Sequence, residues 1–127
     1  MKKILLAFLI ALSVIGFSAC SSNNETPVSP QSENQIEETE YCFRSEKYLN
    51  EHYKKHGIDM GFASAKEYEE AASDVINNPD TLFKIEAEDG DGVYYLEDTN
   101  EFVILSKDGY IRTYFLPDAG KSYFDRQ

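Results

Sequence analysis

The apolar positions between residues 45 and 57 recur with the spacing of a helix. Tyr48, Leu49 and Tyr53 carry the apolar side chains of Ser45–His56, and the remaining positions there are mostly polar. This spacing is typical of an amphipathic helix with one buried stripe. Gly57 follows directly, and glycine is common just past the end of a helix. The pattern therefore predicts a first helix over Ser45–His56.

A second helix is predicted from Ser64 onward. Ser64 and Glu67 have the spacing of a capping box, in which the hydroxyl meets the N3 amide and the carboxylate reaches back. The apolar positions after it keep helical spacing at Tyr68, Ala71, Ala72, Val75 and Ile76. The run Asn77-Asn78-Pro79 ends the helix, because proline cannot continue it.

After Pro79 the hydrophobic period changes to two, which indicates strands. Four strands are predicted, at Leu82–Ala87, Val93–Glu97, Phe102–Ser106 and Tyr110–Leu116. Asp108-Gly109 is a two-residue hairpin signal between the last two. In the ideal fourth strand Arg112 and Thr113 point to opposite faces, unless a bulge intervenes. The expected fold class is α+β, with two N-terminal helices followed by a four-stranded antiparallel sheet.

The acidic run Glu88–Gly92 invites comparison with a calcium loop, but its spacing is wrong. With Gly92 at loop position six, position one falls on Ala87 and position twelve on Asp98. The first ligand and the bidentate glutamate are therefore missing, and a hairpin turn is expected instead. No Cys/His set has zinc spacing. We expect no metal and no other cofactor.

The N-terminus has the pattern of a secretory signal. Lys2 and Lys3 precede an uncharged apolar run, Ile4–Phe17, that is too short to span a bilayer. The sequence Phe17-Ser18-Ala19-Cys20 resembles the lipobox of bacterial lipoproteins. By that resemblance residues 1–19 are a signal peptide, Cys20 is acylated, and a palmitate-type lipid anchor holds the protein on the extracytoplasmic side of the cell membrane. An ordinary signal peptide cleaved after Ala19 is the alternative.

Residues 20–40 are expected to be a disordered acidic tether. Ser21–Glu40 contains five acidic residues, no basic residue and two prolines, so it cannot bury enough apolar surface to fold. The remaining domain, residues 41–127, has ten Lys and Arg against eighteen Asp and Glu, a net charge of -8. This excludes nucleic-acid binding through bulk charge. Cys42 is expected to lack a partner if Cys20 is acylated, and to be buried or to pair between chains.

His52, Lys55 and His56 are the residues of the first predicted helix that can carry chemistry. They are the two histidines of the chain and a lysine of the densest basic cluster, Lys54-Lys55-His56. Histidine is the usual proton-transfer group near neutral pH, and a neighbouring cation can stabilise a developing phosphate charge. The alternative is that both histidines are solvent-facing residues, with His56 favoured by the helix C-terminus.

These residues belong to a longer pattern that covers roughly residues 44–127. Its motifs, in chain order, are His52-x-x-Lys55-His56-Gly57, Gly61, Ser64-x-x-Glu67-Tyr68-x-x-Ala71, Asn100-Glu101-Phe102 and Asp108-Gly109-x-Ile111-Arg112-Thr113-Tyr114-Phe115-x-Pro117. Together they resemble a toxin and phage-borne nuclease family of the barnase–EndoU–colicin–RelE-like (BECR) ribonucleases. The chain differs from the family at Asp59-Met60, where the family usually has Glu-Phe.

The resemblance implies metal-independent cleavage of RNA, in which the 2′-hydroxyl attacks phosphorus and leaves a cyclic phosphate. It implies that His52 is the general base or acid, that Lys55 stabilises the phosphorane and that Thr113 positions the phosphate. His56 would be a second proton-transfer group or a helix-end residue. Arg112 would assist at the phosphate, and Tyr114 would stack on a base.

The expected partners are the membrane through the lipid anchor, RNA, and a cognate immunity protein, with the chain as a monomer. The rival hypothesis is a non-enzymatic surface lipoprotein that binds a protein, an envelope component or a small ligand. The two differ in one respect. A nuclease needs the first helix and the fourth strand to converge in one cleft, whereas a binding module does not.

Overall fold

The computed structural model describes residues 37–127. The predicted signal peptide, the acylated Cys20 and most of the predicted tether lie outside this range, so these expectations stay predictions. None of the described helices combines the length and the apolar character needed to cross a membrane.

The described chain is α+β, as expected. Helix α1 (Glu46–His52) continues into a π-helical turn, η1 (Tyr53–Gly57), and helix α2 (Ala65–Asn77) follows. The antiparallel sheet comprises β1 (Leu82–Ile85), β2 (Gly92–Leu96), β3 (Glu101–Leu105) and β4 (Ile111–Phe115), in that spatial order. A short helix that the sequence pattern did not reveal, α3 (Lys121–Asp125), ends the chain. The α+β class and the four-stranded antiparallel sheet are confirmed.

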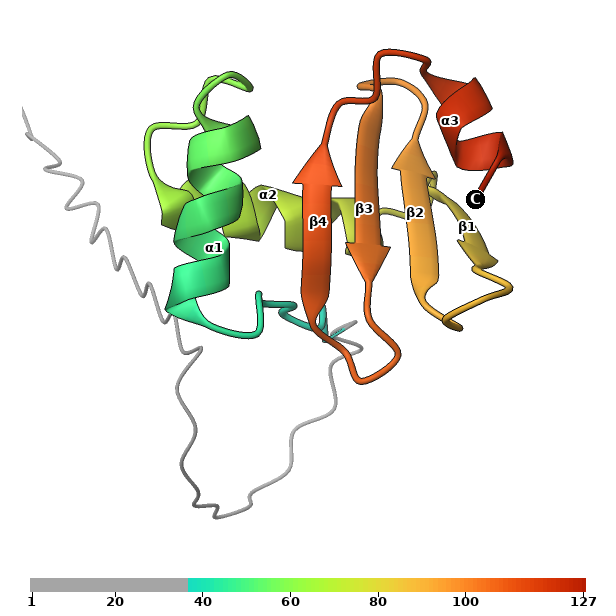
Figure 1. Cartoon of the computed structure of the whole chain (residues 1–127), viewed down its shortest axis with the longest axis horizontal. Coiled ribbons are helices and arrows are strands. Elements are labelled where there is room, and N and C mark those ends of the chain that lie inside the picture. Colours follow the sequence, from blue (N-terminus) through green and yellow to red (C-terminus); the bar gives the residue numbers. More distant parts are fainter. Residues whose placement is uncertain (1–36) are drawn as a thin grey trace, which may run out of the picture. The chain divides into compact units, whose positions relative to one another are not determined.

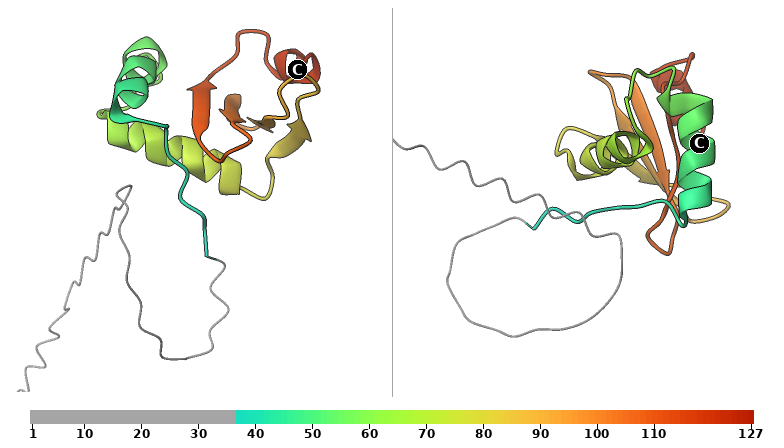
Figure 2. Two further views of the ribbon diagram at one scale, coloured as in Figure 1. Left: turned by 60° about the horizontal axis from the view of Figure 1, so that its bottom comes forward. Right: turned by 90° about the vertical axis from the view of Figure 1, so that its left-hand side faces the viewer.

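Helix α2 crosses one face of the sheet, and α1 stands beside β4 (Figures 1 and 2). The Ser64 hydroxyl accepts the Glu67 amide at 3.2 Å, which confirms the predicted start of α2. The main core lies between α2 and the sheet, and fully buried Tyr68 and Tyr114 are its largest side chains. The Tyr68 hydroxyl donates to the backbone oxygen of Tyr114, which ties α2 to β4.

A second core lies on the other face of the sheet, where α3 packs. Phe124 of α3 is buried there against Val93, Tyr95 and Phe102. Tyr123 and Phe124 both pack back on the sheet. Helix α3 covers this face over β2. The part of the face over β4 stays open to η1, whose His56 stacks on Phe115.

Gly57 has a different role from the one predicted. The chain passes through it in a wide turn, because the Ile58 amide donates to the Tyr53 oxygen five residues back at 3.0 Å. A Cβ on Gly57 would lie 2.4 Å from the ring of Tyr53 and 2.9 Å from that of Tyr68. Glycine is therefore needed for close approach of η1 to α2, and not as a left-handed helix stop.

The loop between β3 and β4 has the length that the predicted strand bounds leave, and it is one residue longer than the two-residue turn that Asp108-Gly109 alone indicates. The Ser106 amide donates to the Tyr110 oxygen at 2.7 Å, which leaves a three-residue loop, Lys107 to Gly109. Gly109 has a φ of 90°, the left-handed conformation that this loop type requires at its last position. The acidic run between β1 and β2 forms the expected hairpin turn, closed by Glu86 N–H to the Asp91 oxygen at 2.8 Å.

The segment before α1 runs along the free side of β4. Phe43 forms a parallel bridge with Ile111, and the Ile111 amide donates to the Cys42 oxygen at 2.8 Å. The Thr39 oxygen already accepts the side-chain amide of Asn77 at 2.8 Å, so contact with α2 begins within the predicted tether. Cys42 is not a free thiol in this structure, which corrects the expectation that it lacks a partner.

Candidate functional site

A cleft of about 430 Å³ opens between α1 and the β3–β4 hairpin. One wall comes from the start and the inner face of α1, and the other from the hairpin and the first residues of β4. Its lining combines two guanidinium groups, two phenol rings and one imidazole, and none of the lining residues is acidic. These residues are Arg44, Tyr48, His52, Ser106, Tyr110, Ile111 and Arg112.

His52 is the imidazole that lines the cleft. Its ring packs against buried Phe43, with the ring centroids 5.2 Å apart. Among the described side chains, its Nδ1 is a buried nitrogen with no hydrogen-bond partner. Burial, followed by the positive charges of His56 and Lys55, lowers the pKa of His52 below its ordinary value. The imidazole is therefore neutral at pH 7, the form that can accept a proton.

His56 and Lys55 lie next to His52 and do not line the cleft. The ring of His56 is 6.2 Å from that of His52 and stacks on Phe115 of β4 at 5.4 Å. Burial and the charge of Lys55 lower the pKa of His56 as well. Lys55 is exposed and acts electrostatically on both rings. The predicted trio is thus close together, but only His52 reaches the cleft.

Arg112 reaches the cleft because β4 carries a bulge. Leu105 pairs with Ile111 and Ile104 pairs with Thr113, so Arg112 is the extra residue on β4. The bulge shifts the alternation, and Ile111 and Tyr114 are consequently buried in the same core. The strict alternation of faces along β4 that the sequence predicts is therefore wrong at Arg112. As the bulged residue, Arg112 lines the cleft.

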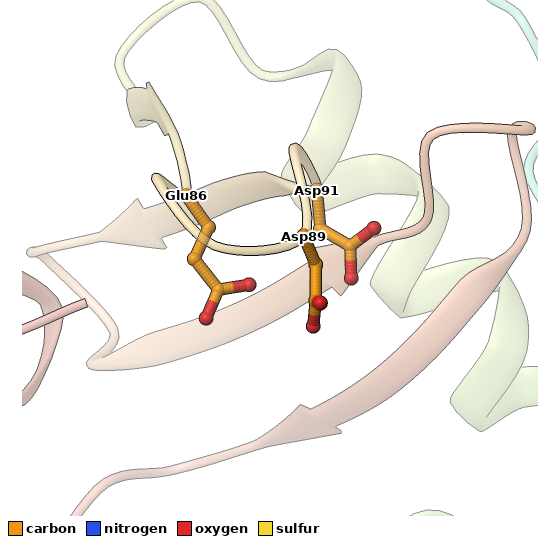
Figure 3. Close-up of side chains that lie close together, drawn as sticks. All are labelled: Glu86, Asp89 and Asp91. Atoms are coloured by element: carbon orange, nitrogen blue, oxygen red, sulfur yellow. The ribbon is translucent and has the colours of Figure 1, made fainter.

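An acidic cluster on the β1–β2 turn holds Arg112. Carboxylate oxygens of Glu86, Asp89 and Asp91 lie within 4.8 Å of one another and point to one side of the turn (Figure 3). The guanidinium of Arg112 is hydrogen-bonded to Asp91 and lies 3.6 Å from Asp89. The Asp91 side chain is only 5% exposed and also accepts the Lys107 amide at 3.2 Å. Arg112 supplies the positive charge that this cluster needs.

Arg44 is the second guanidinium of the lining, and we call the part of the cleft around it, with Tyr48 and Tyr110, the Arg44 end, and the part around Arg112 the Arg112 end. Its guanidinium donates to Asp108 at 2.6 Å and lies 4.6 Å from the ring centroid of Tyr110. Both side chains of the Arg44–Asp108 pair are more than half exposed. Asp108 also accepts the Ser106 hydroxyl at 2.5 Å, and these two hydrogen bonds lower its pKa. This pair links the chain before α1 to the β3–β4 loop.

The other two predicted site residues on β4 do not line the cleft. Thr113 is half-buried opposite Ile104. Tyr114 is fully buried, and its hydroxyl donates to the Glu101 carboxylate. Burial, then the hydrogen bond to Glu101, raises the pKa of Tyr114 far above its ordinary value. The expectation that Tyr114 stacks on a base is wrong, because the ring presents no surface to a ligand.

Four lining residues were not singled out from the sequence: Arg44, Tyr48, Ser106 and Tyr110. Tyr48 was assigned to the buried stripe of the first helix, yet it is 50% exposed. Its i, i+4 spacing to His52 places both side chains on one face of α1, and that spacing could have drawn attention to it. The other three lie in loops or next to them, and no local pattern shows that these loops meet.

No protein-family model matches the chain, and no curated protein matches it. A solved ribonuclease from Escherichia coli, in complex with its inhibitor protein, is similar in structure, with a TM-score of 0.49 and 23% sequence identity. The match covers 61% of this chain and 95% of the ribonuclease chain. A similarity of this size does not by itself decide what the chain does.

Proposed function

We propose that residues 41–127 form a ribonuclease domain that cleaves RNA in the cleft between α1 and β4. The observation that carries the proposal is a neutral, half-buried imidazole, that of His52, in the same cleft as the guanidinium of Arg112. A base that can take a proton and a cation that can hold a phosphate are the two groups that cleavage by the 2′-hydroxyl requires. The motif resemblance described above points to the same chemistry.

In this mechanism His52 takes the proton of the 2′-hydroxyl as the 2′-oxygen bonds to phosphorus. The bond from phosphorus to the 5′-oxygen then breaks, and that oxygen takes a proton from solvent, since His56 does not line the cleft. The products are a 2′,3′-cyclic phosphate and a 5′-hydroxyl. Arg112 stabilises the charge on the phosphorane, and Lys55 adds positive charge from outside the cleft. Thr113 remains a candidate for phosphate positioning only if the ligand extends along β4.

The matched pair His52→Ala and Asn50→Ala tests this role. Asn50 is an exposed residue of the same helix and does not line the cleft. His52→Ala should lower the rate of RNA cleavage by about 10²–10⁴-fold, the usual contribution of a positioned acid or base, and Asn50→Ala should leave it unchanged. Equal rates in both variants would remove His52 from the mechanism. Circular dichroism of both variants checks that the fold is retained.

A lipid anchor on Cys20 is the second part of the proposal. Its support is the lipobox-like sequence alone, since Cys20 lies outside the described residues. Cys20→Ser should release the protein from the membrane fraction or mislocalise it, because the acyl chains proposed to hold it are lost. Cys42→Ser is the matched control and should stay in the membrane fraction. Recovery of Cys20→Ser with the membranes would contradict the anchor.

The alternative function is that of a non-enzymatic surface lipoprotein. The acidic net charge of the domain, -8 over residues 41–127, favours it, since long polyanions are repelled outside the cleft. A chain that binds a ligand in the cleft and cleaves no RNA would support this alternative.

A further inference from the structure

Two exposed tyrosines line the cleft together with Arg44. Tyr48 of α1 is 50% exposed, and Tyr110, next to the β3–β4 loop, is 39% exposed. Neither belongs to either core. Folding alone therefore does not explain why large aromatic rings occupy these positions.

Arg44 adds a third flat group to this part of the cleft. Its guanidinium lies over the Tyr110 ring, 4.6 Å from the centroid. Guanidinium planes and tyrosine rings are the surfaces on which unpaired bases stack in RNA-binding proteins. A volume of about 430 Å³ lies within the range of small-ligand pockets and can take a nucleotide.

The charge of Arg44 favours an anionic ligand, just as the flat groups favour a planar one. The Arg44–Asp108 pair is exposed, so it contributes little to stability and its arginine can exchange partners. When Arg44 turns to a ligand, Asp108 keeps the hydrogen bond from Ser106. An acidic peptide would satisfy Arg44 and Arg112, but it would leave the faces of Tyr48 and Tyr110 without a planar partner.

We propose that Tyr48, Tyr110 and Arg44 form a subsite for the base of the nucleotide whose phosphate lies against His52 and Arg112. This rests on the proposed ribonuclease function, and it adds where the substrate's base is held. Tyr48 and His52 are one helical turn apart on one face of α1, so their side chains are neighbours. A nucleotide bound along that face would place its base against Tyr48 and its phosphate against His52.

The test is equilibrium binding of a 2′-O-methyl RNA oligonucleotide, which cannot be cleaved, to the full chain in detergent. The variants are Tyr48→Ala and Tyr110→Ala, each paired with its conservative form, Tyr48→Phe and Tyr110→Phe. Phe83→Ala is the matched control, because Phe83 is 54% exposed on β1 and remote in sequence from every lining residue. Each alanine variant should weaken binding about 5- to 100-fold, the usual worth of one stacked base. The phenylalanine variants and Phe83→Ala should bind as the wild type does.

A second ligand isolates the contribution of the base. The same oligonucleotide with an abasic residue at one position should bind more weakly than the intact one to the wild type. It should bind equally to the wild type and to Tyr48→Ala. Equal affinity of the intact and abasic ligands at every position, unchanged binding in both alanine variants, or no binding by the wild type would each overturn the subsite.

The outcomes separate this subsite from the proposed function. Oligonucleotide binding that depends on Tyr48 and Tyr110, in a chain that cleaves no RNA, would retain the subsite and remove the nuclease. Cleavage of RNA with an unchanged KM in both alanine variants would retain the nuclease and remove the subsite.

Discussion

The two ends of the cleft each carry an arginine paired with an aspartate from a hairpin turn, yet the two pairs differ in burial. Asp91, the partner of Arg112, has a side chain only 5% exposed, whereas Asp108, the partner of Arg44, is 56% exposed. Asp91 is held further by the Lys107 amide. A buried carboxylate fixes its arginine in place, while an exposed one lets its arginine move. One end of the cleft is therefore preorganised, and the other is adaptable.

The largest effect expected at either end comes from the arginines themselves. Arg112→Ala should lower the rate constant of RNA cleavage by about 10²–10³-fold, because the variant loses a preorganised cation at the phosphate. Arg44→Ala should instead raise KM with little change in kcat, since Arg44 acts on the bound base. Steady-state kinetics on one RNA substrate would measure both. A larger kcat effect at Arg44 than at Arg112 would reverse the assignment of the two ends.

The buried carboxylate gives the next effect, which combines stability and activity. Asp91→Asn should lower the free energy of unfolding by about 1–2 kcal/mol, because the nearly buried pair with Arg112 loses its charge while Arg112 itself stays partly solvated. Cleavage should fall too, since Arg112 is no longer held. Asp89→Asn is the matched control, being exposed and 3.6 Å from the same guanidinium. Urea unfolding of both variants is the measurement, and equal destabilisation would refute the special role of Asp91.

The pH dependence of cleavage depends on His52, between the two ends. Its pKa is lowered in the folded protein, so the neutral base persists below pH 6.5 and activity should fall only as the pH drops through that lowered value. Folding stability should decline as the pH drops below about 6.5, because the unfolded chain then binds the proton more readily. Lys55→Ala removes a positive neighbour and should move the acid limb of the profile to higher pH. A shift in the opposite direction would contradict this account.

The smallest effect is expected at the exposed pair. Asp108→Asn should leave the urea midpoint at the wild-type value within error, because exposed ion pairs contribute little to stability. Oligonucleotide binding should be unchanged or slightly tighter, since Arg44 is no longer drawn toward a carboxylate. A destabilisation as large as that of Asp91→Asn would show that the two pairs do not differ as described.

Much of the fold followed from local patterns. The Ser64 capping box located the start of α2, and the period-two runs located all four strands to within two residues. The π-turn at Gly57 and the bulge at Arg112 did not follow. Both depend on contacts between elements: Gly57 packs closely against Tyr68 of α2, and the pairing of β4 with β3 leaves Arg112 as an extra residue between Ile111 and Thr113. The helical or alternating pattern of one segment does not show how that segment pairs or packs with another.

The site was predictable only in part for the same reason. His52 and Arg112 were singled out and both line the cleft, although the predicted alternation of β4 was wrong. The family resemblance implied that Tyr114 stacks on a base, whereas the bulged strand buries it in the core with Ile111. Arg44 and Tyr110 meet only because the Phe43–Ile111 bridge aligns their segments. Contacts made by a bridge between distant segments leave no signal in the local sequence.

The most direct test of the central claim is incubation of the full chain with end-labelled RNA in the presence of a chelator. The cleft's proton-transfer and charge-stabilising groups are protein side chains, and the nearby carboxylates are engaged by Arg112, so cleavage should continue without added metal. Mass spectrometry should find 2′,3′-cyclic phosphate and 5′-hydroxyl ends, and DNA of the same sequence should stay intact. No cleavage of any RNA, or products with 5′-phosphate ends, would contradict the account.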